Sequence, residues 1–166
     1  QLEYKWGQLT QTIYPTDLYA PVMDYSSGDN SIFLHGGVND PETWKYTIAS
    51  NAWAKLLSTG PPLRTSHYLV KAENSLILFG GYDFTSGQKG DTWKYDIAAN
   101  AWIQLNPQTS PLARYDHSMA YDSLNKQAYL FGGSRSGALL GDLWKYDVAA
   151  NTWSQLNPVT APPPTT

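Results

Sequence analysis

The chain has 166 residues, with 11 Lys and Arg against 14 Asp and Glu, so its formal net charge is −3. This charge, without any run of lysine or arginine, excludes the basic surface expected of a nucleic-acid-binding protein and disfavours anionic membranes. No cysteine occurs, which excludes disulfides and thiolate metal sites, and apolar runs such as "SLILFGG" are too short to span a bilayer.

Aromatic residues reach 14% of the chain, and 13 Gly and 11 Pro residues accompany them, which favours β-structure with many turns. At the N-terminus, Trp6-Gly7-Gln8-Leu9 matches Trp153-Ser154-Gln155-Leu156. We therefore expect residues 1–10 to form an extra strand, equivalent to the last strand of a preceding repeat unit. Because the chain begins with Gln1 and ends in the Pro/Thr-rich segment 158–166, we expect both ends to join something longer.

Three repeat units follow the N-terminal segment, at 11–57, 58–106 and 107–157. Their shared segment reads "PETWKYTIASNAWAKL", then "GDTWKYDIAANAWIQL", then "GDLWKYDVAANTWSQL". Each copy carries two tryptophans at the same spacing: Trp44 and Trp53, Trp93 and Trp102, and Trp144 and Trp153. A period of about fifty residues is typical of propeller blades.

Each unit contains four short segments separated by turn residues. In the third unit these are 116–121, 127–132, 142–147 and 152–156, and their lengths suit β-strands rather than helices. Alternation along a strand places Trp144 and Tyr146 on one face. A single sheet cannot bury such a face alone, so the units must stack, and we predict that the tryptophan pairs pack within or between sheets.

A glycine pair closes the second segment of every unit, in "SIFLHGG", "SLILFGG" and "QAYLFGG". These pairs are Gly36-Gly37, Gly80-Gly81 and Gly132-Gly133. Glycines at the end of a strand indicate a sharp turn or the close approach of another chain segment.

The glycine pairs, each followed by a tyrosine and then a tryptophan, resemble the Kelch repeat family. The following residues are Tyr46 and Trp53, Tyr95 and Trp102, and Tyr146 and Trp153. The resemblance covers residues from about 15 to 156 and implies an all-β propeller of four-stranded blades. We therefore expect an arc of three Kelch blades. The first unit departs from the pattern, because "TDLYAPVMDY" lacks the Arg and His of the later units and His35 replaces a Phe.

Three blades do not close a ring, since propellers use about four to eight. We prefer the explanation that the chain is an arc of a longer propeller. Two alternatives stay open: two copies pair head to tail into a larger ring, or a different subunit caps the arc.

The connections between the second and third segments differ in length and chemistry, whereas the turns between the third and fourth are nearly identical. Variable loops on a rigid scaffold are where binding usually resides, and we expect them to share one face with the connections between blades. The candidate partner-binding residues are Tyr82, Asp83, Phe84, Lys89, Arg135 and Leu140, with Phe84 and Arg135 favoured. The alternative is that these residues are solvated loop tips.

Arg64, His67, Arg114 and His117 have two interpretations. They could line the channel and hold an anionic ligand, or they could satisfy backbone carbonyls and fix adjacent blades. With three histidines and no HExxH motif, we expect no metal site, and no cofactor-binding or catalytic fingerprint occurs.

We therefore predict a non-catalytic Kelch-repeat scaffold that binds a protein partner or further blades through its loops and open end sheets. The alternative is a carbohydrate-binding or carbohydrate-active propeller of an extracellular protein, in which Tyr82 and Phe84 bind sugars. The compartment stays open, because the Pro/Thr-rich tail favours an extracellular or surface protein while no Asn-x-Ser/Thr sequon occurs.

Overall fold

The structure of the chain is a computed structural model that describes residues 13–16, 18–38, 40–56, 58–160 and 162. The regular elements of this part are all β-strands, which confirms the predicted all-β class. Within it, no helix is long and apolar enough to cross a membrane. The extra strand predicted at 1–10 lies outside the described residues.

Three antiparallel sheets of four strands form along the chain, and we call them the first, second and third blade. The first contains β1 (Val22–Ser26), β2 (Ser31–His35), β3 (Thr43–Thr47) and β4 (Ala52–Leu56). The second contains β5 (Tyr68–Ala72), β6 (Ser75–Phe79), β9 (Thr92–Asp96) and β10 (Ala101–Leu105). The third contains β11 (Ser118–Asp122), β12 (Gln127–Phe131), β15 (Leu143–Asp147) and β16 (Thr152–Leu156). Each sheet pairs its strands in chain order, so each is a meander.

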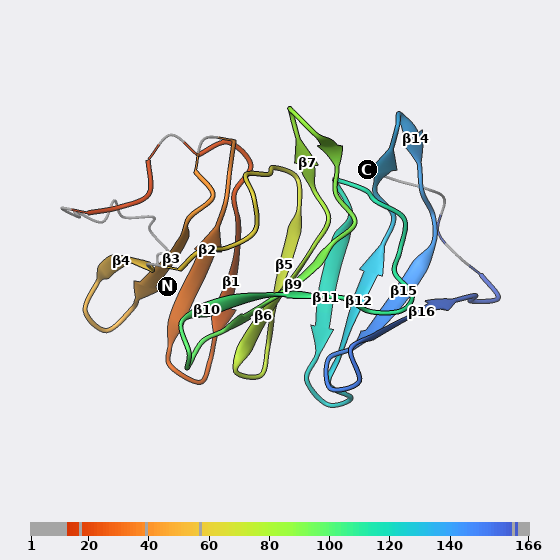
Figure 1. Cartoon of the computed structure of the whole chain (residues 1–166). Coiled ribbons are helices and arrows are strands. Elements are labelled where there is room, and N and C mark those ends of the chain that lie inside the picture. The colour runs from red at the N-terminus through yellow and green to blue at the C-terminus, as the bar shows by residue number, and fades with distance from the viewer. Residues whose placement is uncertain (1–12, 17, 39, 57, 161, 163–166) are drawn as a thin grey trace, which may run out of the picture.

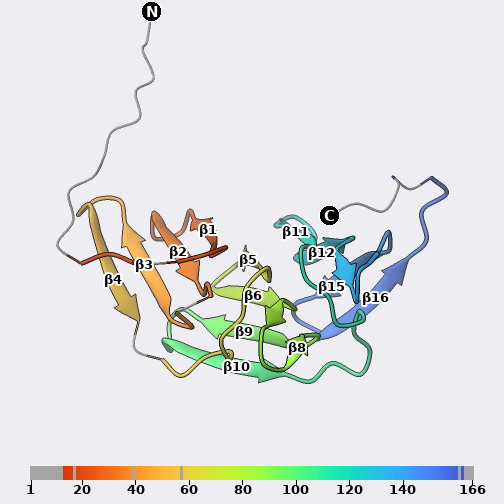
Figure 2. The same cartoon turned by 90° about the horizontal axis from the view of Figure 1, so that it is seen from above.

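The blades stand side by side in an arc (Figure 1). Seen from above, β1, β5 and β11 lie along the concave inner side, while β4, β10 and β16 lie outside (Figure 2). Two short hairpins rise on one face of the arc, at the top of the view in Figure 1. They are β7 (Tyr82–Asp83) with β8 (Gly87–Gln88), and β13 (Ser134–Arg135) with β14 (Ala138–Leu139). These residues were expected in irregular loops, and the two hairpins correct that expectation.

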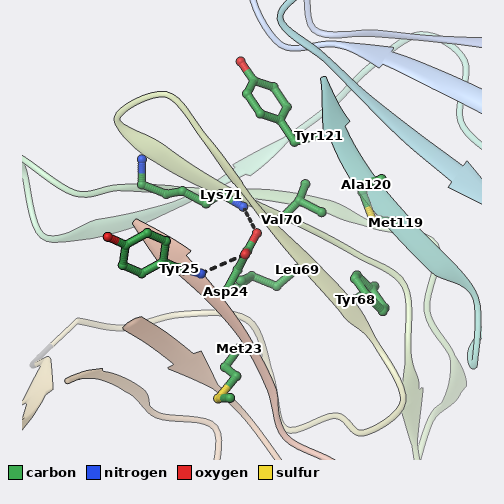
Figure 3. Close-up of a pocket in the computed structure, with 10 residues that line it drawn as sticks. All are labelled: Met23, Asp24, Tyr25, Tyr68, Leu69, Val70, Lys71, Met119, Ala120 and Tyr121. Atoms are coloured by element: carbon green, nitrogen blue, oxygen red, sulfur yellow. Dashed lines mark hydrogen bonds between the residues drawn. The ribbon is translucent and has the colours of Figure 1, made fainter. Parts of the chain in front are cut away.

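The inner edges of the first two blades are joined by one carboxylate. Asp24 on β1 accepts the backbone N–H of Lys71 on β5 at 2.7 Å and that of Tyr25 at 2.8 Å (Figure 3). A short side chain thus satisfies a backbone donor of the neighbouring blade, which fixes the spacing of the two inner strands.

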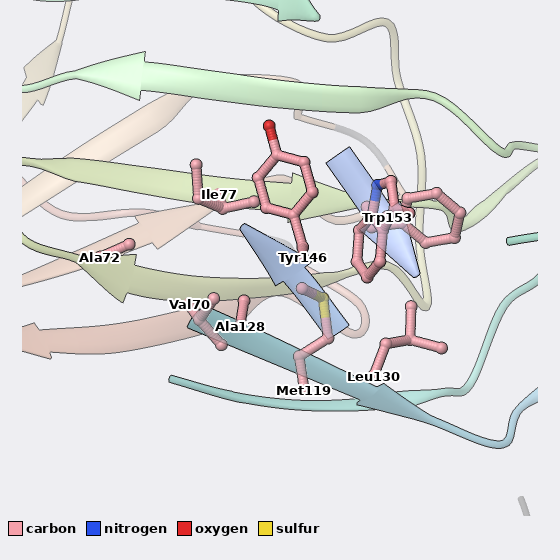
Figure 4. Close-up of a cluster of buried hydrophobic side chains, with 9 residues drawn as sticks. Val70, Ala72, Ile77, Met119, Ala128, Leu130, Tyr146 and Trp153 are labelled. Carbon is pink, nitrogen blue, oxygen red and sulfur yellow. The ribbon is translucent and has the colours of Figure 1, made fainter. Parts of the chain in front are cut away.

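Two apolar clusters hold the three blades together, one in each space between them. The first comprises Phe33, Leu69, Leu76, Leu78, Tyr95 and Trp102. The second, shown in Figure 4, comprises Val70, Ala72, Ile77, Phe79, Met119, Ala128, Leu130, Tyr146 and Trp153. Strand β6 contributes to both clusters, and all five of its residues are buried because a blade covers each of its faces. The prediction that the units stack through aromatic faces is confirmed.

Within each blade, a tyrosine on the third strand stacks on a tryptophan on the fourth. The ring centroids lie 5.2 Å apart for Tyr46 and Trp53 and 4.9 Å apart for Tyr146 and Trp153. Each tyrosine hydroxyl reaches an Asn in the following turn, at 2.8 Å for Tyr146 and Asn151. That Asn has a φ of +53°, which Asn tolerates better than most residues, so one turn both reverses the chain and orients the ring.

The tryptophan of the fourth strand also joins neighbouring blades through its indole N–H. Trp102 donates to Thr43 Oγ1 of the first blade at 2.8 Å, and Trp153 donates to Thr92 Oγ1 of the second at 3.1 Å. We call each of these an indole–threonine contact. Because a buried indole N–H needs an acceptor, the contact sets how one blade sits on the next.

Candidate functional site

The connections between blades and the hairpins meet on one face of the arc, which we call the loop face. Thr65 and Tyr82 exchange backbone hydrogen bonds of 2.9 and 2.8 Å, and Tyr115 and Ser134 exchange bonds of 3.1 and 2.8 Å. Each hairpin is therefore tied to the segment that enters its own blade. The expectation that these two kinds of connection share one face is confirmed by the two bridges.

Four aromatic rings gather on the loop face, and we call them the loop-face aromatic cluster: Tyr19, Tyr82, Phe84 and Tyr115. The Tyr82 ring lies edge-on to Phe84 at 5.5 Å and to Tyr115 at 5.4 Å between centroids. The four rings, with Thr65, Ser66 and Asp116, line a shallow hollow of about 290 Å³. Phe84 is 69% exposed and Tyr19 68% exposed, so much aromatic surface faces solvent.

Asp83 and Lys89 are occupied within the first hairpin. The Asp83 carboxylate accepts the Ser86 hydroxyl and the Thr85 N–H, and it pairs with Lys89 Nζ at 3.3 Å. The pKa of Asp83 lies well below its ordinary value. The main cause is the hydrogen bond from the Ser86 hydroxyl, and the backbone N–H groups of Thr85 and Ser86 and the Lys89 ammonium add to it. Both residues therefore shape the hairpin that carries Phe84.

Arg135 and Leu140 belong to the second hairpin and stand apart from the loop-face aromatic cluster. Arg135 is exposed on β13, and the Leu140 N–H donates to the Gly133 carbonyl at 2.8 Å. The two hairpins meet where Gln88 Nε2 donates to Ser136 Oγ at 3.1 Å. The exposed Arg135 therefore lies on the hairpin next to the one that carries Tyr82 and Phe84.

Arg64 and Arg114 are almost completely buried and engaged within their blades. The guanidinium of Arg64 donates to both oxygens of Asp91, at 2.6 and 2.8 Å, and to the Gly80 carbonyl at 3.0 Å. Burial acts to raise the pKa of Asp91, but the hydrogen bonds and charge of Arg64 outweigh it and lower that pKa. Arg114 repeats the arrangement with Asp142 at 2.6 and 2.7 Å. Neither guanidinium is directed at an external ligand.

The three histidines lie between blades, with their rings packed on other rings. His35 contacts Trp102 at 4.9 Å and His67 at 5.4 Å, and His117 contacts Phe79 at 5.7 Å between ring centroids. Burial first, and then the nearby arginine charge, lowers the pKa of His35 and of His117 to about 3. His35 Nδ1 also makes a hydrogen bond of 3.0 Å with the Thr43 hydroxyl, so His35 adds one polar contact to its packing, whereas His67 and His117 behave as packing groups.

The concave inner surface forms a second hollow, of about 350 Å³, between β1, β5 and β11 (Figure 3). Met23, Tyr25, Lys71, Met119 and Tyr121 are among the side chains around it. Partial burial lowers the pKa of Lys71, and burial raises the pKa of Tyr121. Among the described residues, no group of three or more His, Asp or Glu side chains is placed to hold a metal ion.

A family model for the KLHDC2/KLHL20/DRC7 Kelch-repeats domain matches residues 22–166, which include every strand of the three blades. The chain belongs to the Kelch-repeat family. Its resemblance to Kelch repeats, inferred from the glycine pairs and aromatic residues, is thereby confirmed.

Relatives in this family are considerably longer than the chain. Kelch repeat-containing protein 2 of Saccharomyces cerevisiae is 26% identical, in an alignment that covers 99% of this chain and 21% of the yeast protein. Kelch domain-containing protein 10 of Homo sapiens is 30% identical, with 70% of this chain and 27% of the human protein covered. The chain thus spans about a quarter of the length of these relatives.

A solved structure, that of YjhT, superposes on the chain with a TM-score of 0.75 and 18% sequence identity. The match covers 92% of this chain and 54% of YjhT. It confirms the β-propeller fold of the Kelch blades.

The first Kelch blade replaces the ion pair of the other two with different contacts. Leu18 stands the same distance before β1 as Arg64 stands before β5, and Pro21 takes the place of His67. Glu42, at the position of Asp91, pairs with Lys55 at 2.9 Å instead. The absence of the Arg and His from the first unit is visible in the sequence, and the structure shows which groups replace them.

Two residues of the loop-face aromatic cluster, Tyr19 and Tyr115, were absent from the sequence-based candidates. Tyr115 lies in the connection from the second blade to the third, whereas Tyr19 lies in the segment that enters the first blade. Their positions are equivalent, because Tyr19 is three residues before the start of β1 and Tyr115 is three residues before the start of β11. A tyrosine that recurs at this position in the first and third units was the available signal. Only the fold shows that these connections lie beside the hairpin of the second unit.

Proposed function

We propose that the chain is a non-catalytic Kelch-repeat module that binds a protein partner through its loop face. Kelch repeats typically mediate protein interactions, and membership of that family supports a scaffold role. The observation that carries the proposal is the loop-face aromatic cluster, in which four rings from three connections surround one hollow.

Aromatic side chains on a rigid surface are the usual anchors of protein interfaces. Each ring offers a large contact area, and few torsions must be fixed when it binds. The backbone bonds between Thr65 and Tyr82, and between Tyr115 and Ser134, hold two of these rings before any partner arrives. Binding therefore requires little ordering of the loop face, which favours affinity.

Several of the carboxylates that could serve in catalysis are committed to structural contacts. Asp91 and Asp142 pair with buried arginines, Asp24 accepts backbone N–H groups, and Asp83 closes its own hairpin. Asp122 likewise accepts the N–H groups of its turn, at 2.9 Å from Leu124. These assignments support a binding role over a catalytic one.

A carbohydrate-binding propeller is the second candidate, and the exposed rings of Phe84 and Tyr19 favour it. Flat aromatic rings stack on the apolar faces of sugars as readily as on peptide side chains. Under this alternative the hollow beside Asp116 binds a sugar, and the Asp116 carboxylate accepts hydrogen bonds from the sugar hydroxyls.

Selection from a random peptide display library, run beside a glycan array, tests the two candidates. We expect the library to yield peptides whose affinity falls tenfold or more in Phe84→Ala and in Tyr115→Ala. Leu124→Ala is the matched control, because Leu124 is 87% exposed and lies in the turn between β11 and β12, away from the hairpins. Peptides that bind all variants equally would contradict a loop-face site, and sugars bound in a Phe84-dependent way would favour the second candidate.

A further inference from the structure

Both interfaces between blades contain an indole–threonine contact, and its groups are almost fully buried. The exposed fractions are 8% and 2% for Trp102 and its acceptor Thr43, and 2% and 1% for Trp153 and its acceptor Thr92. In each case the tryptophan belongs to the later blade and the threonine begins the third strand of the earlier blade. The contact therefore gives the arc a direction, with donors facing the N-terminal side and acceptors facing the C-terminal side.

The outer face of the first blade presents the donor half of this contact. Trp53 occupies the position of Trp102 and Trp153, and its ring is held by Tyr46 in the same cross-strand pair. Ile32 and Leu34 share this face, because Ile32 is opposite Tyr46, which is opposite Trp53. Their equivalents on β6, Leu76 and Leu78, are buried against a neighbouring blade. Among the described residues, the Trp53 indole N–H has no hydrogen-bond acceptor.

The outer face of the third blade lacks the acceptor half. Leu143 stands where Thr43 and Thr92 stand, at the first position of the third strand. Phe131 occupies the position of Phe79, so this face is apolar there and offers no hydroxyl. A second copy of the chain, docked head to tail, would place Leu143 against Trp53 and leave the indole N-H without a partner.

We infer that the outer face of the first blade is the docking surface for a further Kelch blade that begins its third strand with Ser or Thr. The third blade of a second copy is not that occupant, because Leu143 cannot accept the indole hydrogen bond. The two internal interfaces supply the template, and relatives several times longer than the chain have room for such a blade. The inference concerns the ends of the arc and does not depend on the loop-face site.

Association of the chain with itself, measured for matched variants at position 143, tests the inference. Thr and Val have the same shape, so Leu143→Thr and Leu143→Val differ only in the hydroxyl that would accept from Trp53. We expect Leu143→Thr to associate about tenfold or more tightly than Leu143→Val at each interface it forms, because one buried donor gains an acceptor. The wild-type chain should resemble Leu143→Val in sedimentation equilibrium over the micromolar range.

Trp53→Phe provides the second arm, since it keeps a ring against Tyr46 and removes only the indole N–H. Combined with Leu143→Thr, Trp53→Phe should abolish the gain in association that Leu143→Thr shows over Leu143→Val. Circular dichroism and thermal melting serve as the control that every variant is folded. Two results would overturn the inference. One is a wild-type dimer that Trp53→Phe weakens, which would make a second copy the occupant. The other is equal association of Leu143→Thr and Leu143→Val, which would show that the hydroxyl does not select the neighbour.

Discussion

The guanidinium of Arg64 donates two hydrogen bonds to the carboxylate of Asp91, although the two residues are 27 positions apart in the chain. The same guanidinium donates to the Gly80 carbonyl and the Pro62 carbonyl, at 3.0 and 3.1 Å. Asp91 in turn accepts the indole N–H of Trp93 at 2.6 Å. One buried ion pair thus joins the entry to the blade, the glycine pair and the start of the third strand.

Replacement of Arg64 by Met should lower the free energy of unfolding by about 3–5 kcal/mol, because it leaves the partly buried Asp91 carboxylate without its cation. Urea denaturation followed by circular dichroism measures the effect. Arg135→Met, at an exposed position of the hairpin, is the control and should change stability by less than about 0.5 kcal/mol. Equal effects of the two substitutions would show that the buried pair contributes no more than a surface arginine.

The strands of the third blade were predictable from sequence because alternation and turn residues are local signals. The predicted segments 127–132 and 152–156 became β12 and β16 with at most one residue of difference. The hairpins were not predictable in this way, since their strands have two residues each and pairing of Tyr82 with Thr65 depends on the finished fold. A strand of two residues is too short to show the alternation of apolar and polar residues that identifies a strand in a sequence.

The candidate site was predictable in part, for a related reason. Phe84 was recognised because it stands in a variable loop, whereas Tyr115 lies in a short connection whose neighbours only the fold brings near. A partner-binding role for Asp83 and Lys89 stays a prediction. The structure adds their pairing within the hairpin, which the sequence could not show, since a polar residue in a loop looks the same in sequence whether it faces a partner or its own turn. Conversely, the pairing of Arg64 with Asp91 needs the third strand to lie beside the glycine pair, which spacing alone does not show.

Gly80 and Gly87 should respond differently to Ala, although both have positive φ, of +66° and +80°. A Cβ on Gly80 would lie 2.6 Å from the Arg114 carbonyl oxygen, whereas a Cβ on Gly87 would meet nothing within 4 Å. We expect Gly87→Ala to cost about 1–2 kcal/mol from backbone strain alone and Gly80→Ala to cost at least about 2 kcal/mol more. Thermal and urea unfolding of the two variants check this; similar losses would mean that the neighbouring blade shifts to make room.

The indole–threonine contact between Trp153 and Thr92 should be measurable as a coupling energy. Thr92→Val leaves a buried N–H without an acceptor and should cost about 1–3 kcal/mol, while Trp153→Phe removes the donor together with part of the ring. In a double-mutant cycle we expect a coupling of about 1 kcal/mol or more between these residues. Thr109→Val is a suitable comparison, because its hydroxyl donates to the Trp153 carbonyl and its loss should not depend on the indole. Additive effects of Thr92→Val and Trp153→Phe would contradict the contact.

Acid should destabilise the chain through its buried histidines. His35 and His117 have a pKa of about 3 in the folded chain, where burial is the main cause, against 6.5 when they are solvated. Above pH 6.5 both are neutral in either state and contribute no pH dependence. Between pH 6.5 and about 3 the unfolded chain binds protons that the folded chain cannot, so stability falls as pH falls, by up to about 1.4 kcal/mol per pH unit for each histidine.

The chain itself supplies the variant that isolates one of these groups, because Phe79 and Phe131 occupy the position of His35 in the other blades. In His35→Phe the ring can still pack on Trp102, as Phe79 packs on Trp153 at 5.2 Å, but the titrating group and its hydrogen bond to the Thr43 hydroxyl are gone. The loss of unfolding free energy between pH 7 and pH 5 should therefore be smaller than in the wild type by about 1–2 kcal/mol. Urea denaturation at both pH values measures it. An unchanged loss would show that His35 takes up a proton in the folded chain, which its burial between Trp102 and His67 opposes.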